Sequence, residues 1–206
     1  MSPTRITHLI GGAEWDGAAE RTSPVYNPAT GEQTGVLDLA TPQLVDEVVR
    51  GAKVAWENEW QHSTLTKRTQ ILFTFRELLN ERKGEIAELI TAEHGKVTSD
   101  ALGEVTRGLE VAEFACGIPH LLKGGYSENV STKVDVYSIL QPLGTVAVIS
   151  PFNFPAMVPM WFVPVAVACG NAVVIKPSEK DPSAVNAVAD DVVNLLRCAW
   201  SGSQRF

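Results

Sequence analysis

The chain contains 206 residues, of which 45% are hydrophobic and 20% charged, and its net charge is −7. This composition is typical of a soluble globular protein with one large domain or two small ones, and it excludes a disordered chain. The cationic residues form no stripe that could engage phosphates, and no apolar run reaches the roughly 18–20 residues that cross a bilayer, so neither nucleic acid nor a membrane is an expected partner.

The N-terminus and the cysteines indicate the compartment. Residues 1–5 carry neither a hydrophobic signal core nor an Arg- and Ser-rich leader, which predicts a cytoplasmic protein. Cys116, Cys169 and Cys198 lie far apart and form no CxxC pair. They therefore predict no zinc site, no other metal site and no disulfide framework, only small buried side chains in a reducing compartment.

The first 125 residues predict a short strand followed mainly by helices. Residues 8–12 (HLIGG) indicate a strand that ends in a glycine turn, and residues 24–32 (PVYNPATGE) favour turns. Thr41 and Pro42 suit the N-cap and first position of a helix. Apolar residues at helical spacing then predict four helices, at about residues 41–55, 66–79, 86–93 and 99–124, with Gly95 ending the third. Together they predict a packed helical layer.

The pattern changes after Gly125. Residues 133–139 (KVDVYSI) alternate with period two, which indicates a half-exposed strand. Such a strand could pair with another chain as an oligomerisation arm. An ordinary hairpin within one chain is the alternative, and the spacing alone favours it.

A β-α-β-α pattern follows. Residues 145–150 (TVAVIS) and 172–175 (AVVI) are apolar runs that suit strands buried on both faces. Helices are expected at 156–169, despite two prolines, and at 182–196. This order predicts a parallel sheet with a right-handed crossover.

Ligands bind beyond the carboxyl ends of strands in such a sheet. Residues 150–155 (SPFNFP) and 176–180 (KPSEK) occupy those places, and neither is a glycine-rich phosphate loop. The residues alone predict a small-molecule cleft with an anion contact at Lys176. Plain turn chemistry is the alternative that the residues leave open.

These segments carry a family resemblance. Residues 142–155 (PLGTVAVISPFNFP), 168–171 (ACGN) and 175–179 (IKPSE) resemble the aldehyde dehydrogenase superfamily, and residues 26–31 (YNPATG) and 93–96 (EHGK) agree. Residues 103–110 (GEVTRGLE), 153–161 (NFPAMVPMW) and 176–183 (KPSEKDPS) are most similar to its CoA-acylating methylmalonate-semialdehyde or malonate-semialdehyde dehydrogenases, which serve valine and inositol breakdown. The resemblance extends to about residue 196.

The resemblance implies an α/β fold and a domain organisation. The expected fold is an N-terminal helical layer plus the first two parallel strands of a Rossmann-like NAD-binding domain, as in a truncated aldehyde dehydrogenase. The expected segments are 1–125 (helical part), 126–141 (β segment and candidate oligomerisation arm), 142–196 (start of the NAD-binding sheet) and 197–206 (divergent tail).

The resemblance also implies site residues. Asn153 matches the family's oxyanion-hole asparagine, which stabilises charge on the tetrahedral intermediate; a buried asparagine satisfied by backbone is the alternative. Arg107 is the candidate that grips the substrate carboxylate, against an ordinary solvated arginine. Five residues match cofactor contacts or adjoin them: Ser150, Phe152, Lys176, Glu179 and Lys180. For Lys176 and Phe152 the alternatives are a solvated lysine and core packing.

The implied function is NAD-dependent oxidation of a small semialdehyde to an acyl-CoA, with CoA as co-substrate, in a homo-oligomer. The family's nucleophilic cysteine and general-base glutamate are expected downstream of this chain, so the chain alone is expected to be inactive, because no covalent intermediate forms without the nucleophile. The alternative is a non-catalytic truncated protein that binds dinucleotide weakly or pairs with full-length subunits.

Overall fold

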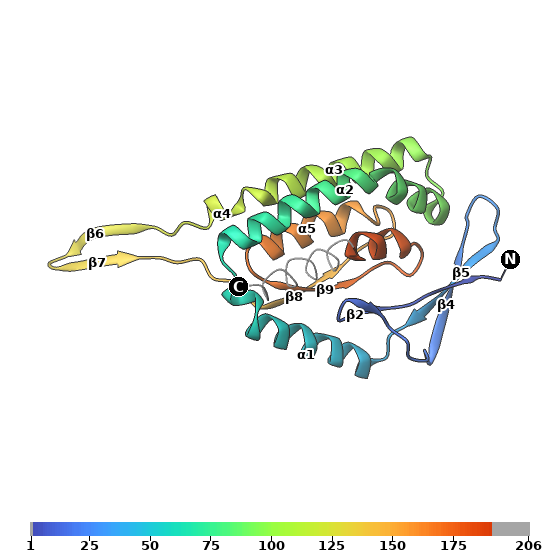
Figure 1. The fold of residues 1–206 in the computed structure, drawn as a ribbon, viewed down its shortest axis with the longest axis horizontal. Helices are drawn as coiled ribbons and strands as arrows, with labels where there is room; N and C mark the ends of the chain where they lie inside the picture. Colours follow the sequence, from blue (N-terminus) through green and yellow to red (C-terminus); the bar gives the residue numbers. More distant parts are fainter. Residues whose placement is uncertain (1, 191–206) are drawn as a thin grey trace, which may run out of the picture.

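The computed structural model describes residues 2–190, and its helices and strands form layers (Figure 1). The outer layer is α2 (Leu65–His94) with α3 (Thr98–Cys116), and α5 (Met157–Ala168) packs beneath it. Next comes the sheet of β8 (Thr145–Ile149) and β9 (Ala172–Lys176), which α1 (Pro42–Asn58) covers from the other side. The predicted α/β class and helical layer are confirmed.

The βαβ unit that follows the hairpin is parallel, as predicted. β8 pairs with β9 in the register Ile149↔Lys176, so both strands end at the same edge. The prediction that both strands are buried on two faces is wrong, because β9 has no buried residue and β8 has one. Val148 is buried, but Ile149 is 75% exposed at the end of the strand, because the helices of the described residues do not extend over it.

A Schellman motif ends α5 and directs the chain into β9. Gly170 N–H bonds to Val167 O and Asn171 N–H to Ala166 O, with Gly170 at φ 92°. The Asn171 side chain accepts hydrogen bonds from the amides of Leu143 and Gly144. Asn171 therefore fixes the start of β8 against the start of β9, which aligns the loops at their opposite ends.

α2 is one helix, where the sequence analysis expected two. Gly84 lies in its middle, and a helix-interior glycine costs about 1 kcal/mol. Burial outweighs that cost, because Phe75, Leu79, Ile86 and Ile90 all pack into one core with α3 and α5. The predicted end of this helix at Gly95 is confirmed. Gly95 adopts the left-handed conformation at φ 83°, and its N–H bonds to Thr91 O.

α3 ends at Cys116, earlier than the expected end near residue 124. Pro119 is the physical reason, since it has no N–H to continue the helix and its ring crowds the preceding turn. A separate short helix, α4 (Ile118–Leu121), begins around it.

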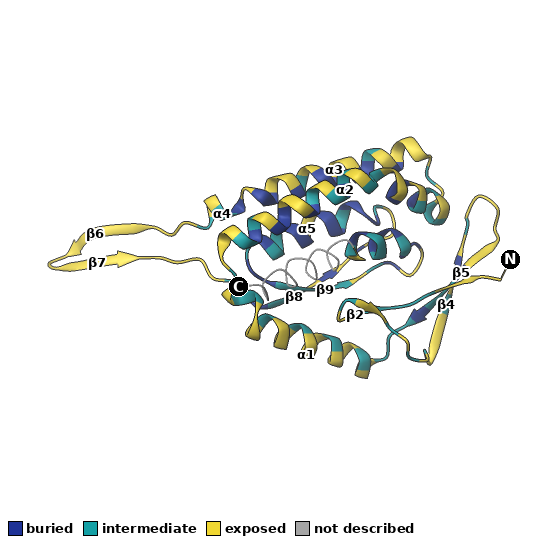
Figure 2. Cartoon of the chain, viewed as in Figure 1, coloured by how far each residue is buried: buried dark blue, intermediate teal, exposed yellow. Residues whose placement is uncertain are grey.

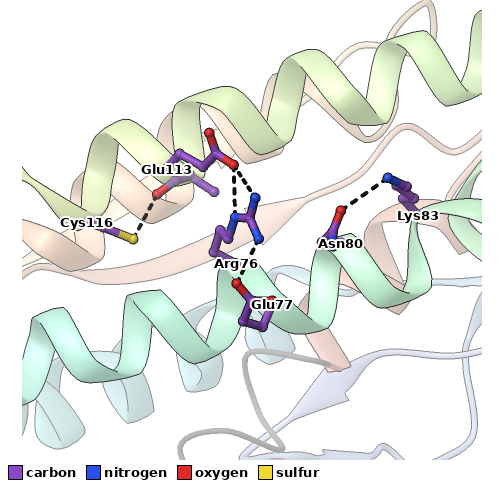
Figure 3. A network of polar contacts seen from close by, with 7 residues as sticks. Arg76, Glu77, Asn80, Lys83, Glu113 and Cys116 are labelled. Atoms are coloured by element: carbon purple, nitrogen blue, oxygen red, sulfur yellow. Dashed lines mark hydrogen bonds and ion pairs between the residues drawn. The ribbon is translucent and has the colours of Figure 1, made fainter.

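An exposed ionic network links α2 and α3 (Figure 3). Arg76 donates to Glu113 through Nε at 2.9 Å and to Glu77 through Nη1 at 2.7 Å. Cys116, also drawn there, donates its thiol to Ala112 O within α3. Exposed pairs contribute about 1 kcal/mol or less, so the buried contacts between the two helices, not this network, hold the layer together.

The N-terminal region holds more strands than predicted. β1 (Thr4–Ile6), β5 (Gln33–Leu39) and β4 (Arg21–Tyr26) form a sheet in that order, and β2 (Leu9–Ile10) pairs with β3 (Ala13–Glu14) across the predicted glycine turn. The expectation that residues 24–26 are a turn was wrong. Pro24 lacks an N–H, but β4 is an edge strand, where proline is tolerated.

β6 (Tyr126–Ser131) and β7 (Val134–Tyr137) form an antiparallel hairpin that projects from the body (Figures 1 and 2). The sequence predicted β7 but not β6. Every residue of both strands is exposed. Within the chain β7 therefore pairs with β6 in an ordinary hairpin, the alternative that the spacing favoured. The role of this segment as an oligomerisation arm stays a prediction.

The remaining elements are the short helix η1 (Trp60–His62) and a helix that is described over residues 183–190. The expected helix at 182–196 is described only to residue 190; its end, Cys198 and the tail at 197–206 lie outside the described residues. None of the helices in the described part of the chain is both long and apolar enough to span a bilayer.

Candidate functional site

The loops after β8 and β9 lie side by side. Ser150 N–H bonds to Lys176 O at 3.1 Å, which extends the strand pairing by one residue. The segments 150–155 and 176–181 therefore leave the sheet together at its carboxyl edge, the place where such sheets bind ligands.

Ser150 and Phe152 line the first loop. Ser150 is buried, and its Oγ has no hydrogen-bond partner among residues 2–190. The Phe152 ring is 49% exposed, which excludes simple core packing. It stacks on His94 at a centroid distance of 6.4 Å, and Lys180 Nζ lies 4.4 Å from its centroid. Burial, assisted by the charge of Lys96, lowers the pKa of His94.

Lys176 and Glu179 form an exposed ion pair in the second loop. Lys176 Nζ lies 3.0 Å from Glu179 Oε2, and both side chains are more than half exposed. A backbone hydrogen bond and the Lys176 ammonium lower the pKa of Glu179. The pair presents one donor and one acceptor to solvent, and exchanging this contact for a ligand costs little because an exposed pair is weak.

Asn153 and Arg107 both adjoin Phe154, Asn153 as its neighbour in the chain and Arg107 from α3. Asn153 is exposed, so the alternative of a buried asparagine is wrong, and its side-chain amide has no partner within the described chain. Arg107 projects from α3, with its guanidinium carbon 5.9 Å from the Phe154 ring and Nε 3.4 Å from Met157 Sδ. Both predicted substrate residues thus adjoin Phe154, and their roles stay predictions.

Two residues that the sequence analysis did not single out hold this loop. Glu104 is fully buried and bonds to the backbone amides of Ala156 and Met157. Lys96 bonds to both Glu104 and the Asn153 carbonyl. The available signal was a carboxylate on the apolar face of a predicted helix, one helical turn from Ala101 and Gly108.

A second buried carboxylate group adjoins them. Glu93 accepts hydrogen bonds from Ser183 N and Oγ, which caps the helix at 183–190, and burial raises the pKa of Glu93. Asp181 is 1% exposed, and its carboxylate oxygens make no hydrogen bond of good geometry within the described chain. Burial, opposed by the nearby Ser178 hydroxyl and reinforced by Glu93, raises the pKa of Asp181 to about 7.

Neither described cysteine is an activated nucleophile. Cys116 lies in the apolar cluster beside Leu72, and burial raises the pKa of its thiol. Burial also raises the pKa of Cys169, although Arg68 opposes this. A nucleophilic cysteine needs a lowered pKa, so both suit the structural role that the sequence predicted.

The fold and these two loops define an α/β protein of the Rossmann-like class. The chain matches the aldehyde dehydrogenase family over residues 15–194 and belongs to that family. It is 44% identical over 185 residues to a malonate-semialdehyde dehydrogenase of Pseudomonas aeruginosa, covering 90% of this chain and 37% of that protein.

Two further relatives agree. An Arabidopsis thaliana protein, the acylating mitochondrial methylmalonate-semialdehyde dehydrogenase, is 44% identical over 91% of this chain and 31% of its own length. The crystal structure of a methylmalonate-semialdehyde dehydrogenase from Sinorhizobium meliloti, complexed with NAD, superposes with a TM-score of 0.90 at 42% identity, covering 94% of this chain and 39% of that one. The chain therefore spans less than two-fifths of the length of these relatives.

Proposed function

We propose that this protein is an NAD-dependent, CoA-acylating dehydrogenase of malonate or methylmalonate semialdehyde, and that the described residues supply part of its active site. The observation that carries the proposal is the position of Arg107, whose guanidinium carbon lies 5.9 Å from the ring centroid of Phe154, the residue after Asn153, in the loop at the carboxyl edge of a parallel sheet. A semialdehyde has a reactive carbonyl and a carboxylate, and the side chains of Asn153 and Arg107 match one group each.

The residues fit NAD. A ribose hydroxyl needs a donor or an acceptor, and the exposed pair Lys176–Glu179 offers both. We assign the adenosine ribose to this pair, with Lys180 beside it. We also assign Ser150 and Phe152 to this cofactor, since the Ser150 Oγ has no partner among residues 2–190 and Phe152 is 49% exposed. When bound, NAD accepts the hydride that the aldehyde loses.

The chain's own residues act on the substrate. The Asn153 amide donates to the carbonyl oxygen as negative charge develops there. The Arg107 guanidinium holds the distant carboxylate with paired hydrogen bonds. CoA is proposed as the acyl acceptor, supported by the likeness to relatives that carry the acylating name. Among residues 2–190 no side chain is assigned as nucleophile, general base or CoA ligand.

A second candidate function is non-catalytic: binding dinucleotide weakly or pairing with full-length subunits. The fully exposed β6–β7 hairpin favours pairing, and in either case we propose that it joins a second copy in a homo-oligomer. The experiment that separates the two is the intact mass of the native gene product, with NADH and acyl-CoA formation measured on the same sample. A 22.3 kDa product that forms no NADH favours the second candidate; a larger, active one favours the first.

Replacing Arg107 with leucine tests whether this side chain binds the substrate carboxylate. A charge-assisted pair contributes about 1.5–3 kcal/mol, so kcat/KM for malonate semialdehyde should fall about 10–100-fold. The kcat/KM for propanal, which has no carboxylate, should stay within about twofold. Arg50→Leu, an exposed arginine on α1, is the matched control and should change neither value. Equal losses for both aldehydes in Arg107→Leu would show that Arg107 does not read the carboxylate.

A further inference from the structure

Glu104 is a fully buried carboxylate with three hydrogen bonds. Its Oε1 accepts from the backbone amides of Ala156 at 2.9 Å and Met157 at 3.1 Å, at the N-terminus of α5. Its Oε2 accepts from Lys96 Nζ at 2.6 Å. Glu104 thus connects α3, the segment after α2 and the start of α5 through one side chain.

Lys96 extends this connection to the site. Its side chain is 13% exposed, and Nζ also donates to the Asn153 carbonyl at 3.0 Å and lies 4.5 Å from the Phe154 ring centroid. The backbone of the loop is therefore held at Asn153 on one side and at Ala156 and Met157 on the other. Between these points the Asn153 amide remains exposed, so the contacts fix its backbone and leave its side chain available.

We propose that Glu104 and Lys96 are positioning residues that hold the Asn153 amide in place for the reaction, an inference that rests on the proposed oxyanion role of Asn153. An amide donor stabilises an oxyanion only when it is fixed before charge develops. Lys96 cannot hold the Asn153 carbonyl in one place unless its own position is fixed, and the buried carboxylate of Glu104 provides this. The ordinary alternative is that Glu104 only caps α5.

The test is a double-mutant cycle in the protein at its native length, read as kcat with saturating semialdehyde, NAD and CoA. Asn153→Ala should lower kcat about 100-fold. Glu104→Gln keeps the shape of the side chain but points an NH2 group at Lys96, and it should lower kcat about 10–30-fold. The double variant should fall within about threefold of Asn153→Ala alone, because Glu104 acts through Asn153. NAD affinity should be unchanged in all three.

Glu110→Gln, an exposed glutamate on the same helix, is the matched control and should retain the kcat of the wild type. Multiplicative losses in the double variant, or a kcat of Glu104→Gln within about twofold of the wild type, would overturn the inference and leave the proposed function standing. An unchanged kcat in Asn153→Ala would overturn both, since the oxyanion role itself would then be absent.

Lys96 provides a second variant if Glu104→Gln folds poorly. Lys96→Met removes both the ion pair with Glu104 and the link to Asn153, while the backbone amides of α5 can still bond to Glu104. We expect kcat to fall about 10-fold, and Lys96→Arg, which keeps a cationic donor, should restore most of it. Hydrogen exchange supplies a readout that is independent of turnover. The amides of Ala156 and Met157 should exchange faster in Glu104→Ala, which removes their acceptor, and should exchange at the wild-type rate in Asn153→Ala. A wild-type kcat in Lys96→Met would contradict the positioning role.

Discussion

Gly170→Ala is expected to lower the free energy of unfolding by about 3 kcal/mol, from two costs that add. Gly170 has φ 92°, a left-handed conformation that costs a residue with a Cβ about 1–2 kcal/mol. A Cβ at this position would also lie 2.4 Å from Arg68 Nη1. Arg68 is itself 6% exposed and bonded to Ser63, so it has little room to move, and overpacking of this kind costs about 1–3 kcal/mol.

Urea denaturation of the variant and the wild type measures this change. Gly51→Ala in α1 is the matched control, since nothing lies within 4 Å of its added Cβ. It should stabilise the protein by about 0.5–1 kcal/mol, because alanine favours a helix over glycine. A Gly170→Ala protein within about 0.5 kcal/mol of the wild type would show that the Schellman turn and Arg68 adjust freely.

Asp181→Asn is expected to stabilise the protein at pH 8 and change little at pH 4. Burial raises the pKa of Asp181 from 3.8 to about 7. A raised pKa means that the folded state binds a proton that the unfolded state releases, so this stability is complete below about pH 3.8 and is lost as pH rises through 7. The full effect is on the order of 4 kcal/mol. Asparagine carries no charge at either pH, so it avoids the cost of burying a carboxylate.

The measurement is the free energy of unfolding of wild type and variant from pH 4 to pH 8, compared at each pH. Asp46→Asn, an exposed aspartate on α1, should follow the wild type. The carboxylates of Glu93 and Glu104 and the ammonium of Lys96 face Asp181 from α2, α3 and the segment between them. Glu93 also has a raised pKa through burial, so a smaller slope of the same sign should remain in Asp181→Asn. Parallel curves for wild type and variant would show that Asp181 does not bury its charge.

Several features of this protein follow from the sequence by itself, because they depend on neighbours within a few residues. Thr41 and Pro42 start α1 as predicted, with Thr41 Oγ1 accepting from Leu44 N–H. Gly95 ends α2. The two apolar runs predict β8 and β9, and the family motifs after them indicate the loops where the candidate site lies.

Tertiary contacts decided the rest. α2 continues through Gly84 because the core outweighs a local preference. The contacts of Glu104 with Ala156, of Lys96 with Asn153 and of Glu93 with Ser183 join residues that are 52, 57 and 90 positions apart. Such pairings leave no periodic pattern in the sequence. The sequence could therefore indicate Asn153 and Arg107 as candidates, but only the packing of α3 against α5 puts Arg107 near Phe154 and connects the buried Glu104 to the loop that carries Asn153.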